Sequence, residues 1–98
     1  MSVLIWVIYD ISDDRVRNKI AKECKKYGLE RVQKSVFLGK LQANRFDELA
    51  EICLDLINED EDSVYLFPFC QDDFRRIKVL GQGFDRELVN EEILSRFF

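Results

Sequence analysis

Acidic side chains cluster just after the most apolar segment of the sequence. Asp10 directly follows the apolar run Val3–Tyr9, and Asp13 and Asp14 come soon afterwards. Asp13 and Asp14 suit the first turn of a helix, where the helix dipole favours anions, whereas Asp10 precedes that turn. A carboxylate there can bind a hard cation such as Mg²⁺, which usually needs one or two carboxylates together with phosphate and water. The alternative for Asp10 is an ordinary turn carboxylate.

A second copy of the chain would complete this minimal ligand set. If a two-fold axis brought two copies of the strand end together, their Asp10 carboxylates would face each other. Such a pair is a plausible site for metal-assisted phosphodiester hydrolysis. The chain has no histidine, which excludes Ser-His-Asp and Cys-His catalysis and any zinc site with histidine ligands.

The three cysteines, Cys24, Cys53 and Cys70, have no CxxC spacing, so neither a disulfide framework nor a four-cysteine zinc site is expected. They lie at apolar positions, and we predict that all three are inert core residues. An odd number of free cysteines fits a reducing cytoplasm. The longest apolar run has seven residues, against the roughly 20 of a membrane helix, so no membrane association is expected.

Positive charge is concentrated in the first half of a chain whose net charge is −4. Residues 1–45 carry net +5 and residues 46–98 carry net −9, so a basic surface can exist locally. One helix face holds a basic stripe that is either a solvated face or a contact for phosphates: Arg15, Lys19, Lys22 and Lys26. Arg17 lies outside this stripe and either covers the core with its stem or points toward the strand end that holds Asp10.

Other residues have two interpretations each. Tyr9 is a half-buried strand residue or part of a site, and Phe37 is a core residue or a stacking platform. A basic cluster near a turn protects an edge strand by its charge or contacts phosphate: Arg75, Arg76 and Lys78.

The hydrophobic pattern of these 98 residues predicts one domain of alternating strands and helices. We expect the following elements in order: a strand over Val3–Tyr9, a helix over about 13–27 with Ser12 as its N-cap and Gly28 at its end, two strands within Leu29–Leu41 that divide near Gln33–Ser35, a helix over 43–58, a strand over Val64–Cys70 and a further strand over Phe74–Leu80. For the tail Phe84–Phe98 we expect a short helix capped by Asp85.

This order predicts an α+β fold of the ferredoxin-like type, βαββαβ, with an extra C-terminal strand. The ferredoxin-like domain spans residues 1–80, and residues 81–98 form a tail whose apolar residues suit docking to a partner. Both helices lie on one face of the sheet and leave the other face bare. A second copy packed sheet to sheet is the simplest cover, so we expect a homodimer.

Several motifs together resemble the CRISPR-associated Cas-two family, the small protein of spacer acquisition. They are Tyr9-Asp-Ile-Ser-Asp-Asp14, Arg17-Asn-Lys-Ile-Ala-Lys22, Tyr27-Gly-Leu-Glu-Arg-Val-Gln33, Ser35-Val-Phe-Leu-Gly39 and, more loosely, Asp62-Ser-Val-Tyr-Leu-Phe-Pro68. The match covers about residues 2–80, and the tail after Gly83 lies outside it.

The resemblance implies a ferredoxin-like homodimer in which the extra strand completes the partner's sheet. Asp10 matches the family's aspartate that pairs across the dimer and is assigned a divalent metal, Mg²⁺ with Mn²⁺ as the alternative, and nuclease activity on single-stranded RNA or duplex DNA. Tyr9, Arg17, Arg31 and Phe37 match positions assigned to the same site or its neighbourhood.

The resemblance also implies a second role, in which the dimer bridges two dimers of the Cas-one integrase and holds duplex DNA without catalysis. The acidic second half and a pI near 4.8 leave Arg15, Arg17, Arg75 and Arg76 as the focused nucleic-acid-binding candidates. Two other functions remain open: a ferredoxin-like regulatory module that binds a small molecule at the dimer interface, and a toxin-type endoribonuclease.

Overall fold

A single sheet of four strands forms the centre of the molecule, and its most apolar strand lies inside it. The computed structural model describes residues 2–78 and 80–81. The strands are β1 (Ser2–Asp10), β2 (Glu30–Gln33), β3 (Val36–Gln42) and β4 (Ser63–Phe69), in the order β2-β3-β1-β4. All neighbouring strands pair antiparallel. The unbroken apolar run therefore becomes a strand with partners on both edges, as its composition predicts.

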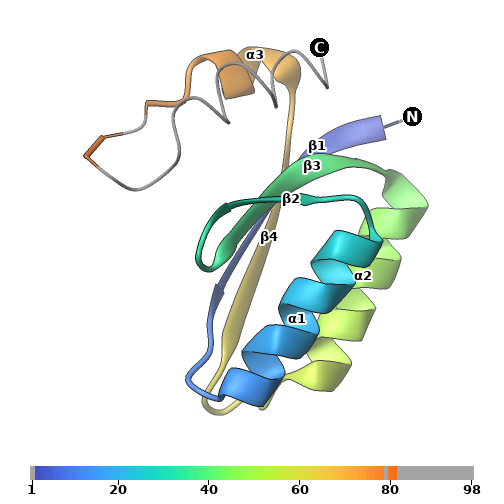
Figure 1. Cartoon of the computed structure of the whole chain (residues 1–98). Helices are drawn as coiled ribbons and strands as arrows, with labels where there is room; N and C mark the ends of the chain where they lie inside the picture. The colour runs from blue at the N-terminus through green and yellow to red at the C-terminus, as the bar shows by residue number, and fades with distance from the viewer. Residues whose placement is uncertain (1, 79, 82–98) are drawn as a thin grey trace.

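Two helices cover one face of this sheet. Figure 1 shows α1 (Asp14–Lys26) and α2 (Ala43–Leu56) side by side on that face. Their buried residues, among them Ile20 and Leu49, pack with Ile5 and Val7 of β1 and with Phe37 of β3 in the main hydrophobic cluster. α1 ends at Lys26, and Gly28 follows the C-cap Tyr27 with a φ of +83° that suits a residue without a side chain, so the predicted stop is confirmed.

A second apolar cluster lies on the opposite face of the sheet. It contains Leu4 and Trp6 of β1, Leu38 of β3 and Phe74 of the short helix α3 (Gln71–Arg75). The cover is incomplete, because Tyr65 and Phe67 of β4 remain 52% and 48% exposed on this face. The sheet therefore retains exposed aromatic surface on the face away from α1 and α2.

The ferredoxin-like arrangement and the division of Leu29–Leu41 into two strands are confirmed. The further strand predicted over Phe74–Leu80 is wrong for the part that the structure describes: Gln71–Arg75 is helical, and residues 76–78 and 80 join no strand. Asp72 and Asp73 occupy the first turn of α3, where the helix dipole favours carboxylates. Arg75, Arg76 and Lys78 therefore do not protect an edge strand in the described structure.

The tail prediction for residues 84–98 lies outside the described residues. Within the described part of the chain, no helix has the length and apolar character needed to cross a membrane.

A matched pair of leucines on α2 tests the main cluster. Leu49 is fully buried, whereas Leu54, five residues later, is 52% exposed. We expect Leu49→Ala to lower the free energy of unfolding by about 2–5 kcal/mol, since it removes buried methyl groups and leaves a cavity. Leu54→Ala makes the same chemical change at the surface and should stay within about 0.5 kcal/mol of wild type. Urea unfolding followed by circular dichroism measures both, and similar losses would contradict this packing.

Candidate functional site

The last two residues of β1 direct their side chains to opposite faces of the sheet. Tyr9 belongs to the main cluster on the helix face and is only 4% exposed. Side chains alternate along a strand, so Asp10 falls on the same face as Trp6 and Ile8. Asp10 is exposed and lies opposite Ser63 in the pairing with β4. Neighbours in sequence thus belong to two different surfaces.

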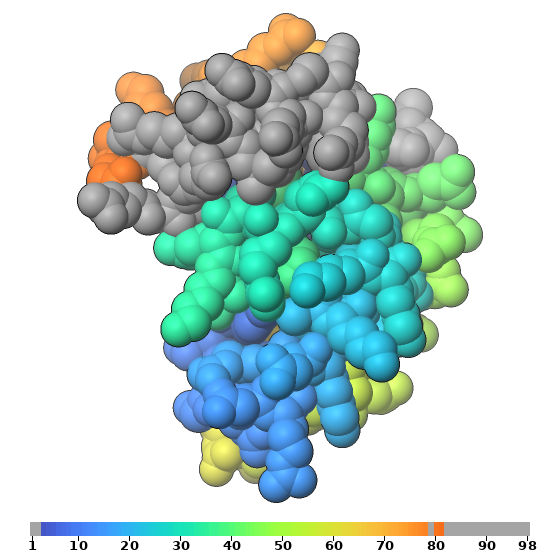
Figure 2. All heavy atoms as spheres, viewed as in Figure 1, coloured from blue at the N-terminus to red at the C-terminus, as the bar shows by residue number. Residues whose placement is uncertain are grey.

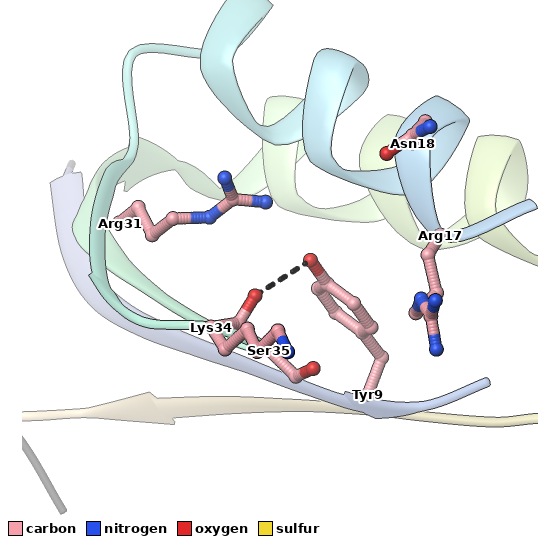
Figure 3. A pocket seen from close by; sticks show the side chains of 6 residues that line it. All are labelled: Tyr9, Arg17, Asn18, Arg31, Lys34 and Ser35. Carbon is pink, nitrogen blue, oxygen red and sulfur yellow. Dashed lines mark hydrogen bonds between the residues drawn. The ribbon is translucent and has the colours of Figure 1, made fainter. Parts of the chain in front are cut away.

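A hollow of about 290 Å³ opens on the helix side of the strand end, beside Tyr9. It lies between the beginning of α1 and the turn that joins β2 to β3, two segments that are adjacent at the surface in Figure 2. Six residues line it: Tyr9, Arg17, Asn18, Arg31, Lys34 and Ser35 (Figure 3). Three of the six are cationic and none is acidic, so the hollow is suited to an anion.

Tyr9 connects the β2–β3 turn to β1. Its hydroxyl donates a hydrogen bond to the carbonyl oxygen of Lys34 at 3.4 Å, the dashed line in Figure 3. Its backbone N–H donates to the carbonyl oxygen of Ser35 at 3.1 Å. These two bonds fix the turn that carries the Lys34 and Ser35 side chains. One interpretation predicted that Tyr9 is half-buried. The residue is instead almost fully buried, and it also lines the hollow.

The ring of Phe37 contacts the guanidinium group of Arg31. The Arg31 guanidinium carbon lies 5.1 Å from the centroid of the Phe37 ring, within the range of a cation–π contact. Phe37 is fully buried and its ring stacks with that of Tyr9, with 6.4 Å between centroids. Phe37 is therefore a core residue, and its connection to the hollow is through Arg31.

Arg17 points toward the strand end, which decides between its two sequence interpretations. Its Nη1 donates a hydrogen bond to the carbonyl oxygen of Ile11 at 3.2 Å, and its Nη2 pairs with the carboxylate of Asp14. Ile11 belongs to the segment that joins β1 to α1, and Asp14 is the first residue of α1. Arg17 thus holds the segment that follows Asp10, and part of its charge is balanced by Asp14.

Asp13, and not the predicted Ser12, is the N-cap of α1. Its carboxylate accepts hydrogen bonds from the backbone N–H groups of Arg15 at 2.8 Å and Val16 at 3.3 Å. The bond from Val16, followed by that from Arg15, lowers the pKa of the Asp13 carboxyl below its ordinary value of 3.8. A charged acceptor satisfies two orphan N–H groups here, which a serine one residue earlier does not.

Asp10 belongs to no cluster of three or more possible metal ligands in the part of the chain that the structure describes. Among residues 2–78 and 80–81, no three Asp, Glu, Cys or His side chains are grouped to hold a metal ion. The donor chemistry of Asp10 fits Mg²⁺, but its exposed carboxylate needs further ligands from outside the described chain.

The remaining sequence candidates lie apart from the hollow. Arg15 is exposed in the first turn of α1 and does not line it. Arg75 and Arg76 are exposed at the end of α3, which follows the end of β4. Since that end of β4 pairs with Leu4, near the start of β1, these two arginines lie at the opposite end of the sheet from Tyr9.

The sequence interpretation missed three lining residues, Asn18, Lys34 and Ser35. A signal existed for two of them, because the turn at Lys34–Ser35 comes between two expected strands and must lie at a strand end. Asn18 adjoins Arg17, but its place on the wall depends on the angle of α1 to the sheet.

The cysteines differ in their surroundings. Burial raises the pKa of the Cys24 thiol to about 12 and that of Cys53 to about 11, so both are inert core residues as predicted. The core prediction is wrong for Cys70, which is exposed and donates a hydrogen bond from its thiol to the Asp73 carboxylate at 3.2 Å.

Comparison with known proteins identifies the family of this chain. The family described as CRISPR associated protein Cas2 matches residues 1–77. The chain belongs to this Cas2 family. It is 43% identical over 69 residues to a CRISPR-associated endoribonuclease Cas2 of Archaeoglobus fulgidus, covering 70% of this chain and 73% of the relative. It is 34% identical over 79 residues to the corresponding Cas2 of Korarchaeum cryptofilum, covering 81% and 85%.

Solved structures show the same Cas2 fold. A crystal structure of a hypothetical protein from Thermus thermophilus has a TM-score of 0.71 and 35% identity, over 85% of this chain and 95% of that one. Cas2 of Streptococcus pyogenes has a TM-score of 0.69 and 28% identity, over 80% of this chain and 99% of that one. The resemblance seen in the sequence motifs is confirmed at the level of family and fold.

The N-cap assignment in this Cas2 chain predicts a pH-dependent difference between two variants. Asp13→Ala should lower the melting temperature at pH 7 by roughly 5 °C, because two N–H groups lose their acceptor. A carboxyl with a lowered folded pKa stabilises the fold fully above its unfolded pKa, and this contribution is lost as the pH falls through the folded value. The difference from wild type should therefore shrink below about pH 3.8.

Ser12→Ala is the matched control, since Ser12 makes no cap bond. Its melting temperature should follow wild type across the same range in thermal unfolding monitored by circular dichroism. A larger loss for Ser12→Ala than for Asp13→Ala would contradict the assignment.

Proposed function

We propose that this Cas2 chain is a nucleic-acid-binding homodimer of CRISPR spacer acquisition that bridges dimers of the Cas-one integrase. We propose further that its paired Asp10 carboxylates bind Mg²⁺, or Mn²⁺, for endonuclease activity on single-stranded RNA or duplex DNA. The observation that carries the proposal is that Asp10 borders the sheet face that keeps exposed aromatic surface.

The sheet face favours self-association. A second hollow of about 290 Å³ is lined by Trp6, Ile8, Phe67 and Ile77, and Tyr65 and Phe67 are about half exposed beside it. Burial of such surface drives association at roughly 25 cal/mol per Å² of apolar area. A two-fold interface uses the same surface on both copies. Packing of this sheet face against its copy would therefore bring the two Asp10 carboxylates near the interface.

A dimer would also supply a second carboxylate ligand for a metal ion at Asp10. One exposed carboxylate is a poor Mg²⁺ site, whereas two, with water and a substrate phosphate, match the ligands that Mg²⁺ prefers. The bound ion would activate a water molecule and stabilise charge on the phosphate. The chain's own contribution is to place Asp10 at the end of a rigid, doubly paired strand.

The basic residues supply the attraction for nucleic acid in an acidic protein. Arg15 and Arg17 lie near the beginning of α1, five and seven residues after the end of β1, and Arg15 is exposed whereas Arg17 is partly buried. Such cations bind phosphates without reading sequence. Arg75 and Arg76 would contact a duplex only at the far end of the sheet. The relatives are named endoribonucleases, which favours this function over a regulatory small-molecule module.

Phe67 provides the test of the homodimer. Wild type should sediment at about twice 11.7 kDa. Phe67→Asp should shift it toward the monomer, because a charge on the sheet face cannot be buried without a partner. The control Leu54→Asp changes an equally exposed apolar residue on α2 and should remain dimeric. A monomeric wild type at tens of micromolar in sedimentation velocity would contradict the dimer.

Asp10→Asn provides the test of metal-dependent cleavage, since it keeps the shape and removes the charge that a cation needs. Wild type in Mg²⁺ should cleave single-stranded RNA or duplex DNA, and both EDTA and Asp10→Asn should lower the rate by at least about a hundredfold. Asp55→Asn, at an exposed position on α2, should cleave like wild type.

Binding measured on the same samples separates the two roles. If no protein cleaves but both bind duplex DNA with a steep salt dependence, the bridging role stands and the nuclease role falls. Absence of both binding and cleavage in wild type would count against the whole proposal.

A further inference from the structure

We infer that the hollow beside Tyr9 is a subsite for one phosphate group of the nucleic acid, anchored by Arg31 and Lys34. The inference rests on the proposed function, because it takes the ligand to be part of a nucleic-acid chain. It adds Lys34 and the β2–β3 turn to the binding surface, and it separates this surface from Asp10.

The charge of the hollow is not balanced from within. Within the described part of the chain, neither the Arg31 nor the Lys34 side chain forms an ion pair or a hydrogen bond to a carboxylate. The third cation, Arg17, is already engaged with Asp14. Glu30 precedes Arg31, but it lies opposite Leu38 in the ladder and so falls on the other face of the sheet. Arg31 and Lys34 therefore remain available to a bound anion.

The site is held in place before any ligand arrives. The Phe37 ring supports the Arg31 guanidinium, which extends from β2 toward α1 in Figure 3. The Tyr9 hydroxyl donates to the Lys34 carbonyl, and this bond fixes the backbone from which the Lys34 side chain extends. A prearranged cation site loses less conformational entropy on binding than a flexible one.

The chemistry of the wall selects phosphate. Arg presents several N–H donors in a fork that matches phosphate oxygens, Lys adds a mobile point charge, and the Ser35 hydroxyl is a further donor at the edge. The volume of about 290 Å³ falls at the small end of ligand pockets, which span roughly 300–1,000 Å³. This volume suits a phosphate with part of its sugar.

The place of the hollow fixes its role. It opens on the helix face of β1, whereas Asp10 falls on the opposite face. A phosphate held by Arg31 and Lys34 is therefore not the phosphate that would meet a metal at Asp10. Arg31 and Lys34 would hold the nucleic acid by its backbone, so the loss of either cation should weaken binding.

Inorganic phosphate is the simplest probe of the hollow. In titrations of ¹⁵N-labelled wild type at constant ionic strength, the amide signals of Ser35 and Asn18 should shift and saturate. They should not do so in Lys34→Gln. The control Lys25→Gln removes the same charge at the far end of α1, outside the hollow, and should titrate like wild type. Equal shifts in Lys34→Gln, or no saturation in wild type, would overturn the inference.

Nucleic-acid binding across a salt series tests the same site independently. Lys34→Gln should raise the Kd for duplex DNA roughly tenfold, as for loss of one charge-assisted hydrogen bond. It should also lower the slope of log K against log salt by about 1, whereas Lys25→Gln should leave both unchanged.

Duplexes with 5′-hydroxyl and 5′-phosphate ends separate the two sources of the phosphate. A change with both duplexes assigns an internal phosphodiester, and a change with the 5′-phosphate alone assigns a terminal phosphate.

The two proposals fail in different ways. If wild type binds duplex DNA and Lys34→Gln keeps its affinity and salt slope, the subsite is refuted and the proposed function stands. If wild type binds no nucleic acid while phosphate still saturates at Ser35 and Asn18, the proposed function falls. The hollow is then an anion site without a nucleic-acid ligand, and the inference as stated is overturned.

Discussion

The double pairing of β1 is the constraint on which the rest of the structure depends. β1 bonds to β3 along one edge and to β4 along the other, and its side chains alternate between two apolar clusters. A slip of one residue would move Ile5 and Val7 out of the main cluster and replace them with Leu4 and Trp6. The register is therefore fixed by core packing. This register places Tyr9 under the hollow and Asp10 on the opposite face.

Much of the fold follows from local patterns, because periodicity and caps are local. The apolar run of β1, the amphipathic α1 and α2 and the stop at Gly28 all correspond to short-range signals in the sequence. The segment after β4 does not. Phe74 begins the segment for which a strand is predicted, yet it is buried in the second cluster as part of α3. The carboxylates of Asp72 and Asp73 are a local signal for the first turn of α3, but the burial of Phe74 depends on tertiary packing.

The site was predicted in part, for a related reason. Residue types and family motifs identified Tyr9, Arg17, Arg31 and Phe37, and the structure brings these four together. The same motifs suggested one site that also contains Asp10, whereas the strand separates it from them. The contacts that give each residue its role are three-dimensional: Arg17 with Asp14 and Ile11, and Arg31 above Phe37. Spacing along the chain contains neither.

The acidic average of the chain conceals how its charge is arranged. Eight of the 19 acidic residues lie on α2 and on the 59–62 segment that follows it, while the hollow is formed by α1, β1, β2 and the β2–β3 turn. At physiological salt, exposed charges separated by more than about 8 Å are largely screened from one another. An anion in the hollow would therefore respond chiefly to Arg31, Lys34 and Arg17. A net charge of −4 is thus compatible with a cationic binding surface.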